Sequence, residues 1–286
     1  MLQTRPLEKR LGRWMRARLP DRLTEFIMFG LKMGWASLFG GLMLGAIIAS
    51  RALWQADWPI ARYDALLALA LVVQAVFLAF RFETLDEAKV IVLFHLTGTA
   101  MEWFKVSAGS WTYPEPALFK LLDVPLFSGF MYASVGSFIA RVIRLFEMGF
   151  SPYPPHGLTV LLALGIYANF YTHHFIWDLR LVLIAATVAV YGHTTIGYTV
   201  GRRHRMNLVL AAALSSFFLW LAENIGTLTG TWVYAGKHLS SFASLSKMGS
   251  WYLLLYVAFI TVTVVVKPRS DEPAAERDQG NAANRQ

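Results

Sequence analysis

The sequence predicts an all-α integral membrane protein with eight transmembrane helices. Of its 286 residues, 56% are hydrophobic and only 15% are charged, and the apolar residues gather in long runs. A run of about 18 or more apolar residues fits the roughly 30 Å hydrocarbon core of a bilayer. Such runs are far longer than the roughly ten-residue strands of a membrane barrel, so helices are predicted to satisfy the backbone hydrogen bonds in lipid. The runs cover residues 26–50, 58–80, 88–109, 124–146, 156–175, 177–200, 206–229 and 248–266.

The positions of Lys and Arg predict the orientation, because cytoplasmic loops retain these residues. With both termini inside, 18 of the 26 Lys and Arg residues fall on the inner side and seven on the outer side, while Lys32 lies within the first run. This asymmetry predicts cytoplasmic N- and C-termini and an even number of spans. The net charge of +8 then marks topology and attraction to anionic membrane lipid. We expect no nucleic-acid partner.

The two ends of the chain differ from the apolar runs in composition. Residues 1–25 carry Leu7, Leu11 and Trp14 at helical spacing among arginines, which predicts a basic segment lying on the inner leaflet. A flexible basic tail that only directs topology fits the same residues. Residues 268–286 are polar and Ala-rich, and we expect them to form a disordered cytoplasmic tail. The chain has no cysteine, which excludes disulfides, thiolate metal sites and a cysteine nucleophile.

Two segments share a pattern that predicts an internal duplication. An offset of 121 residues aligns EWFKVSAGSWTY (102–113) with ENIGTLTGTWVY (223–234), so that Glu, Gly, Trp and Tyr coincide. With one deletion, Tyr132 aligns with Tyr252. The two glutamates lie four predicted spans apart, so both copies run in the same direction. Residues 26–150 and 151–267 are therefore predicted to be two parallel four-helix repeats.

Each of the two glutamates is expected about two helical turns below the outer end of its span. An ionised side chain at that depth costs about 2–3 kcal/mol, so Glu102 and Glu223 should face the bundle interior, a partner or water. A carboxyl buried without a cation would hold its proton and could act as a general acid, and two facing carboxyls would titrate as a coupled pair. The alternative is a neutral Glu that hydrogen-bonds across a helix pair and joins the two halves.

The neighbours of the two glutamates are unequal. Lys105 follows Glu102 by one helical turn and can pair with it, whereas Gly226 stands at the equivalent place after Glu223. Glu223 is therefore the better candidate for a proton donor. His95 lies on the same face as Glu102 and two turns deeper, where it serves either in a proton relay or as an interhelical hydrogen-bond partner.

The segment FYTHHFIWDLR (170–180) places further titratable residues at the outer end of the fifth predicted span. Adjacent histidines project about 100° apart on a helix, so His173 and His174 do not form a zinc motif, and we predict no metal and no other cofactor. His174 and Asp178 can share a helix face and, with Glu102 or Glu223, complete a hard-ligand or acid/base cluster. The alternative is that they are solvated residues at the outer edge.

The glycine in each copy permits a turn after the helix end, and the alternate aromatic residues then project to one side of an extended segment. These rings can anchor the chain at the membrane interface, or they can line a cavity above the acid and stabilise a developing carbocation by cation–π attraction. The candidate substrate-binding residues are Trp111, Tyr113, Tyr132, Trp232, Tyr234, Tyr252 and Lys105.

The membrane portion, residues 24–267, resembles the YoaT-like family of bacterial inner-membrane proteins of unknown function, most closely in SLSKMGSWYLLLYV (244–257). This resemblance implies a multi-pass protein of the bacterial inner (plasma) membrane and no particular activity. A second, local resemblance, to membrane carotenoid hydratases and heterodimer-type lycopene cyclases, rests on Glu102, Gly109, Trp111, Tyr113 and VPLFSGFMY (124–132). It implies chemistry that begins by protonating a polyene double bond.

Three functions remain open on these patterns. The leading one is a membrane enzyme that protonates a lipid-soluble, isoprenoid-type substrate through Glu223 or Glu102. The others are a proton- or ion-coupled transporter or channel, and a structural membrane protein whose glutamates only join helices. A lateral cavity between the glutamates favours the enzyme, a path open to water favours the carrier, and a packed seam favours the structural role.

Overall fold

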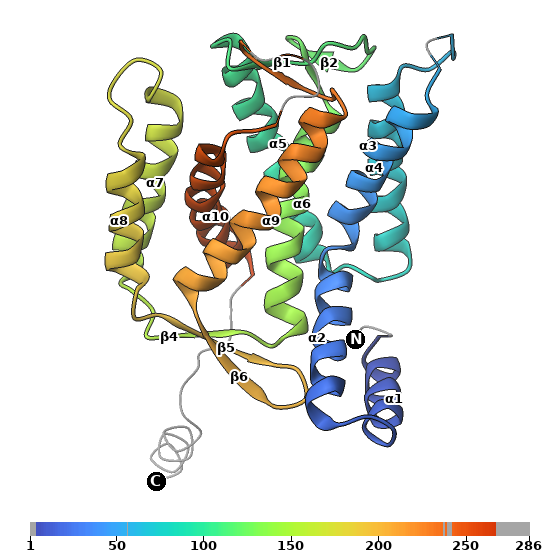
Figure 1. Ribbon diagram of the computed structural model, residues 1–286, viewed down its shortest axis with the longest axis vertical. Helices are drawn as coiled ribbons and strands as arrows, with labels where there is room; N and C mark the ends of the chain where they lie inside the picture. Colours follow the sequence, from blue (N-terminus) through green and yellow to red (C-terminus); the bar gives the residue numbers. More distant parts are fainter. Residues whose placement is uncertain (1–3, 56, 237, 239–241, 267–286) are drawn as a thin grey trace.

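Helices make up most of this structure, a computed structural model that describes residues 4–55, 57–236, 238 and 242–266 (Figure 1). The predicted disordered tail, residues 268–286, lies outside the described residues. The helices are α1 (Thr4–Arg16), α2 (Asp21–Ala36), α3 (Leu38–Leu53), α4 (Arg62–Ala79), α5 (Leu85–Ser107), α6 (Phe127–Leu145), α7 (His156–Thr172), α8 (Arg180–Tyr191), α9 (Leu208–Leu228) and α10 (Leu245–Val265). The strands are β1 (Trp111–Thr112), β2 (Lys120–Leu121), β3 (Val124–Pro125), β4 (Gly149–Ser151), β5 (Thr195–Thr199), β6 (Arg203–Asn207) and β7 (Val233–Tyr234).

Within the described part of the chain, three helices are long and apolar enough to cross a membrane, namely α4, α9 and α10. The pair α2 and α3 meets the same criterion, although the two helices bend by 69° where Ser37 separates them. The first predicted span is thus broken, in a stretch where Gly34, Ser37 and Gly40 lower the cost of a kink. These helices are those of a multi-pass membrane protein.

The sixth predicted span, residues 177–200, is shorter than expected. α8 ends at Tyr191, and β5 follows as the central strand of a sheet with the order β4-β5-β6. β5 pairs antiparallel with both neighbours, with Gly197 opposite Gly149 and opposite Arg205. The β-branched residues after Gly192 favour a strand, and the 12 residues of α8 extend over only about 18 Å.

The two ends of the helical bundle carry different elements (Figure 1). The sheet end, at the bottom of Figure 1, carries α1 and β4–β6, and the turn end, at the top, carries β1 and β2. Ion pairs are buried toward the sheet end: Arg141 binds Glu83, and Arg144 Nε lies 2.6 Å from Glu87 Oε1. The neighbouring Lys32 Nζ donates to the backbone oxygen of Leu145 at 3.1 Å. The charged side chains that are buried at this end therefore have ion-pair or hydrogen-bond partners that offset the cost of their burial.

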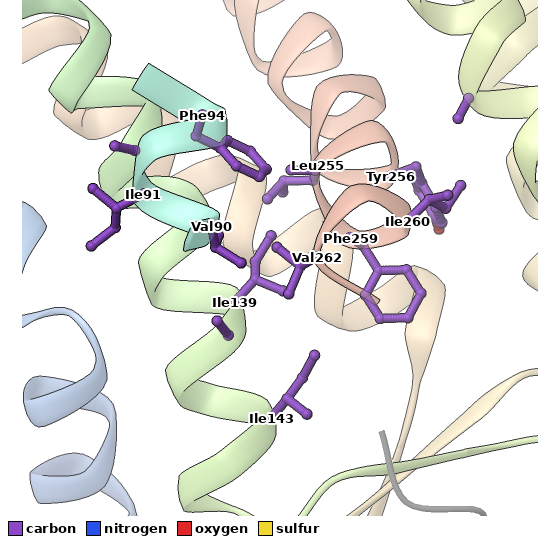
Figure 2. Packing of buried hydrophobic residues seen from close by; sticks show 14 of the residues in the cluster. Val90, Ile91, Phe94, Ile139, Ile143, Leu255, Tyr256, Phe259, Ile260 and Val262 are labelled. Atoms are coloured by element: carbon purple, nitrogen blue, oxygen red, sulfur yellow. The ribbon is translucent and has the colours of Figure 1, made fainter. Parts of the chain in front are cut away.

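A hydrophobic core joins α5, α6 and α10 and provides the rigid base of the site (Figure 2). Val90 of α5, Ile139 of α6 and Val262 of α10 are among its buried side chains. A Cβ at Gly136 would come within 2.7 Å of the Phe94 ring, so this glycine allows α5 and α6 to pack closely. The ends of these three helices hold most of the residues described next.

Candidate functional site

Glu102 is held by a ring of three hydrogen-bond donors. After α5, Gly109 adopts a φ of +70° and turns the chain back over the helix end, as the sequence predicts. Trp111 Nε1 and Tyr113 OH then donate to Glu102 Oε2 at 2.7 and 2.8 Å. From α6, Tyr132 OH donates to Glu102 Oε1 at 2.7 Å. We call Glu102 and these three partners the first carboxyl clamp.

Glu223 has the same arrangement at the end of α9. Gly230 adopts a φ of +64°, and Trp232 Nε1 and Tyr234 OH donate to Glu223 Oε1 at 2.9 and 2.5 Å. The third donor comes from α10, where Trp251 Nε1 lies 3.3 Å from Glu223 Oε2. We call Glu223 and these three partners the second carboxyl clamp.

The second clamp has a glycine beside it, Gly226, where the first clamp has a lysine, and this difference has a steric cause. A Cβ at Gly226 would lie 1.8 Å from the Trp232 ring, so the indole of the second clamp occupies the space above this glycine. Lys105 stands at the equivalent place in α5. Its spacing allows a pair with Glu102, but the structure does not contain that pair. Instead, Lys105 Nζ donates to the backbone oxygen of Phe170 at 2.6 Å. That oxygen lies in the last turn of α7, where helix carbonyls lack intrahelical partners.

The two clamps touch through backbone and aromatic rings. β1 pairs antiparallel with β7, with Trp111 opposite Tyr234. The rings of these two residues lie 5.7 Å apart, and those of Tyr132 and Trp251 lie 6.3 Å apart. Each carboxyl hydrogen-bonds to donors of its own clamp rather than across the pair. These contacts cross a helix pair within each half, α5 and α6 for Glu102 and α9 and α10 for Glu223.

A cavity of about 800 Å³ lies against both clamps. This volume falls within the range of about 300–1,000 Å³ typical of small-molecule sites. Its walls come from α2, α3, α5, α6, α7, α9, α10 and the first residue of α8, and most of the lining side chains are apolar. They include Met33, Met43, Ile47, Phe138, Ile166, Leu219 and Leu255. Both carboxyl clamps thus border one cavity.

The cavity has exposed lining residues at two levels. Ser37 and Gly41, at the break between α2 and α3, are exposed, as is Phe218 in the middle of α9. At the turn end, His174 and Phe242 are exposed as well. The first group lies halfway along helices that are apolar enough to span a membrane, and the second lies at the level of the connecting turns. Exposed lining residues thus lie both at the side of the bundle and at its turn end.

Three cations line the cavity near the turn end: Lys105, Arg180 and Lys247. Lys105 is only 2% exposed. Sequence reasoning included Lys105 but missed the other two, although Arg180 closes the FYTHHFIWDLR segment and Lys247 directly precedes the last apolar run. A basic residue beside an apolar run indicates topology, and its position in the sequence contains no sign of a cavity.

His174 and Asp178 do not form the shared cluster that their spacing suggested. α7 has ended before them, and His174 Nε2 accepts from Lys105 Nζ at 2.9 Å. Burial, followed by the charge of Lys105, lowers the pKa of His174. Asp178 instead pairs with Arg180, whose Nη2 lies 3.1 Å from its Oδ2, and it does not line the cavity. In the described ranges, no group of three or more His, Cys, Asp or Glu is arranged to hold a metal ion.

Two more of the predicted residues lie outside the cavity. The His95 ring stacks near Phe130, with centroids 4.3 Å apart, inside the contact of α5 and α6. Tyr252 OH lies 3.0 Å from Thr187 Oγ1, between α10 and α8. The place that Tyr132 holds in the first clamp is held in the second by Trp251, one residue before the aligned Tyr252. The predicted residues that the structure brings together around the cavity are Glu102, Lys105, Trp111, Tyr113, Tyr132, His174, Glu223, Trp232 and Tyr234.

These features define a class: a mostly helical, multi-pass membrane protein with two buried carboxyls beside a central cavity. The chain belongs to the family described as "Protein of unknown function (DUF817)", which matches residues 25–259. It is 41% identical over 260 residues to the "Uncharacterized protein YoaT" of Bacillus subtilis (strain 168), covering 90% of this chain and 98% of that protein. The predicted membership of a YoaT-like family is thereby confirmed.

Two solved structures are similar over part of the chain. Both are of a mycobacterial Insig homologue from Mycobacterium vanbaalenii, one of them as a cross-linked trimer. Each covers 65% of this chain and 98% of its own, with a TM-score of 0.44 and sequence identities of 14% and 13%.

Proposed function

We propose that this protein is a membrane enzyme that binds a lipid-soluble, isoprenoid-type substrate in the central cavity. The observation that carries the proposal is the cavity itself, about 800 Å³ in volume, mostly apolar and in contact with both buried glutamates. Its exposed lining at Ser37, Gly41 and Phe218 supports entry from the hydrocarbon core of the bilayer. An apolar substrate would then reach the glutamates without crossing water.

Glu223 is the proposed proton donor. Glu102 has donors at 2.7–2.8 Å on both oxygens, whereas among the described residues the contact to Glu223 Oε2, from Trp251 Nε1, is 3.3 Å long. Oε2 of Glu223 is therefore the carboxyl oxygen with the weakest protein contact and the most readily exchanged for a substrate. On protonation of a double bond, the carboxyl O–H bond breaks and a C–H bond forms. The rings of Trp232 and Tyr234 would stabilise the resulting carbocation.

The same proposal includes an eight-span topology with parallel duplicated halves and cytoplasmic termini. The bent pair α2–α3 would be one span, and α4 to α10 would supply seven more. The equivalent clamps at Glu102 and Glu223 and the pairing of β1 with β7 support the duplication. On α1, the exposed Trp14 beside arginines supports an interfacial N-terminal segment at the sheet end. The 41% identity to a Bacillus protein supports a bacterial plasma-membrane location.

A proton- or ion-coupled carrier is the second candidate. The observation that favours it is the additional exposure of cavity-lining residues at the turn end, at His174 and Phe242. A carrier would need a path to water at that end, which an enzyme acting on lipid would not.

Separate Glu102→Gln and Glu223→Gln variants test the enzyme. Lipids and pigments extracted from cells that express each variant at matched protein level would be compared by mass spectrometry. Loss of a general acid lowers a rate by about 10²- to 10⁴-fold, so Glu223→Gln should deplete the product lipid and accumulate its precursor. The control is Glu25→Gln, which alters a carboxyl at the sheet end that lies 3.1 Å from His204 Nε2 and 3.8 Å from Arg202 Nε and does not line the cavity. Unchanged lipid profiles in both cavity variants would contradict the proposal of an enzyme. If proton-coupled uptake by the cells changed in the same variants, the result would favour a carrier.

A further inference from the structure

Three helices bring one cation each to the turn end of the cavity. Lys105 comes from α5, Arg180 from the first position of α8 and Lys247 from the first turn of α10. The positive charges of Lys247 and Arg180 and the negative charge of Asp178 act on Lys105, and those of Glu223 and Arg180 act on Lys247. We call these three residues the basic cluster.

The described residues do not neutralise the basic cluster. Asp178, at 3.1 Å from Arg180, is the carboxylate at ion-pair distance from one of its members. Lys105 Nζ has two neutral acceptors, the backbone oxygen of Phe170 and His174 Nε2 at 2.9 Å. Lys247 Nζ lies 4.0 Å from the centroid of the Tyr234 ring. Two ammonium groups are thus partly removed from water without a carboxylate at ion-pair distance, which is costly unless an anion completes the site.

The positions of two cluster members on their helices are unfavourable by themselves. The N-terminal end of a helix carries a partial positive charge, so acidic residues are normally favoured there. α8 and α10 have no acidic residue in the first turn, and they place Arg180 and Lys247 there instead. Breaking a local rule in this way is typical of functional sites, and helix N-termini combined with cations attract oxyanions.

The cavity gives this anion a hydrocarbon environment on one side. The basic cluster lies near the turn end, where the exposed His174 also lines the cavity, whereas Met43, Ile47 and Leu255 line its apolar part. A ligand that fills the space must therefore have one anionic end and one apolar end. With Glu223 protonated, as the proposed function requires, the three cations and the carboxylate of Asp178 leave a local charge of about +2, which matches the charge of about −1.5 to −2 on a phosphate monoester at neutral pH.

We propose that the basic cluster binds the phosphate headgroup of a lipid monophosphate whose hydrocarbon tail occupies the apolar part of the cavity. This inference rests on the proposed lipid-binding function and names the class of lipid. It accounts for Lys105 donating away from Glu102, because Lys105 is then a headgroup ligand rather than the partner of the clamp. A Lys or Arg bound to phosphate makes charge-assisted hydrogen bonds that a neutral headgroup cannot make.

Binding of three probes to the purified full chain in neutral detergent tests the proposal. The probes are farnesyl phosphate, farnesol and inorganic phosphate, and binding is measured by calorimetry and by the rise in unfolding temperature. We expect farnesyl phosphate to bind at least about 100-fold more tightly than farnesol, because each charge-assisted hydrogen bond contributes about tenfold or more. Lys105→Gln and Lys247→Gln should each weaken the binding of farnesyl phosphate about tenfold and leave the binding of farnesol unchanged.

The control variant is Lys120→Gln. Lys120 is also a turn-end lysine, but it does not line the cavity, and its Nζ donates to the backbone oxygen of Tyr113 at 3.3 Å. This variant should bind farnesyl phosphate as the wild type does. Lys247 is half-buried and so remains testable if the buried Lys105 does not tolerate Gln.

Each other outcome contradicts a definite statement. Equal affinity for farnesol and farnesyl phosphate overturns the headgroup site and leaves lipid binding intact. Inorganic phosphate binding as tightly as farnesyl phosphate also overturns it, because the site would then serve a free anion. If Lys247→Gln and Lys120→Gln weakened the binding of farnesyl phosphate equally, the effect would be one of general charge, and this result would also overturn the headgroup site. No binding of either farnesyl compound would contradict the proposed lipid-binding function itself.

Discussion

Removing one phenolic oxygen from the first carboxyl clamp should destabilise the protein measurably. Tyr113 OH donates to Glu102 Oε2 at 2.8 Å, and the two residues are 6% and 3% exposed. The substitution Tyr113→Phe keeps the ring and removes only this donor, so its cost is that of one buried hydrogen bond, about 1–3 kcal/mol. At about 2 °C per kcal/mol for a chain of this size, the unfolding temperature should fall by about 2–6 °C.

The assay is thermal unfolding of the purified full chain in detergent, followed by tryptophan fluorescence. It compares the wild type with Tyr113→Phe, Glu102→Gln and the double variant. Because the two side chains share one contact, the double variant should lose about 1 kcal/mol less than the two single losses combined. Tyr167→Phe is the control, since its hydroxyl lies 2.9 Å from that of Tyr171 and contacts no carboxyl in the clamps. Strict additivity of the two clamp variants would refute the reasoning.

Three further variants test other parts of the structure. Gly226→Ala should cost about 1–3 kcal/mol, measured as a lower unfolding temperature, because its Cβ would lie 1.8 Å from the Trp232 ring. Burial and nearby cations lower the pKa of His174, so the folded chain binds fewer protons there than the unfolded chain. Wild-type stability should therefore fall as pH drops through about 6.5, and fall less in His174→Gln. Arg141→Met leaves the buried Glu83 without its cation and should cost about 3–5 kcal/mol, which would appear as a lower yield of folded protein by size-exclusion chromatography.

The clamps were the most predictable part of the site because their geometry is local. A helix end, a glycine with positive φ and alternate side chains on an extended segment together bring Trp111 and Tyr113 back over Glu102. Each step follows from the backbone preferences of a few consecutive residues. The same spacing recurs at Glu223, and so does the same geometry.

Other parts of the site depend on packing between distant helices and could not be read from spacing. Lys105 was expected to pair with Glu102 one turn away, but a free carbonyl at the end of α7 and His174 lie within reach of it. Arg180 and Lys247 join the cavity only because the first turns of α8 and α10 border it together with α5. These contacts are tertiary, and one sequence contains no signal for them.

The differences between the predicted spans and the observed helices and strands have a related cause. Hydropathy detects apolar residues but not whether they form a helix or a strand, so the run at 177–200 hid the change from α8 to β5. The bend between α2 and α3 was likewise invisible to a window that measures only apolarity. That bend matters for function, because Ser37 and Gly41 there line the cavity. The resemblance to carotenoid hydratases stays a prediction.

The central claim, that a lipid-soluble molecule occupies the cavity between the clamps, is tested most directly by closing that cavity. Gly41 lines it and Gly45, one turn later on α3, does not, and a Cβ at either position meets no atom within 4 Å. Leucine fits both helical positions, so Gly41→Leu and Gly45→Leu form a matched pair. Lipids that co-purify with each full-length variant would be quantified by mass spectrometry. The account predicts that Gly41→Leu loses a lipid that the wild type and Gly45→Leu retain, and equal lipid content in all three would contradict it.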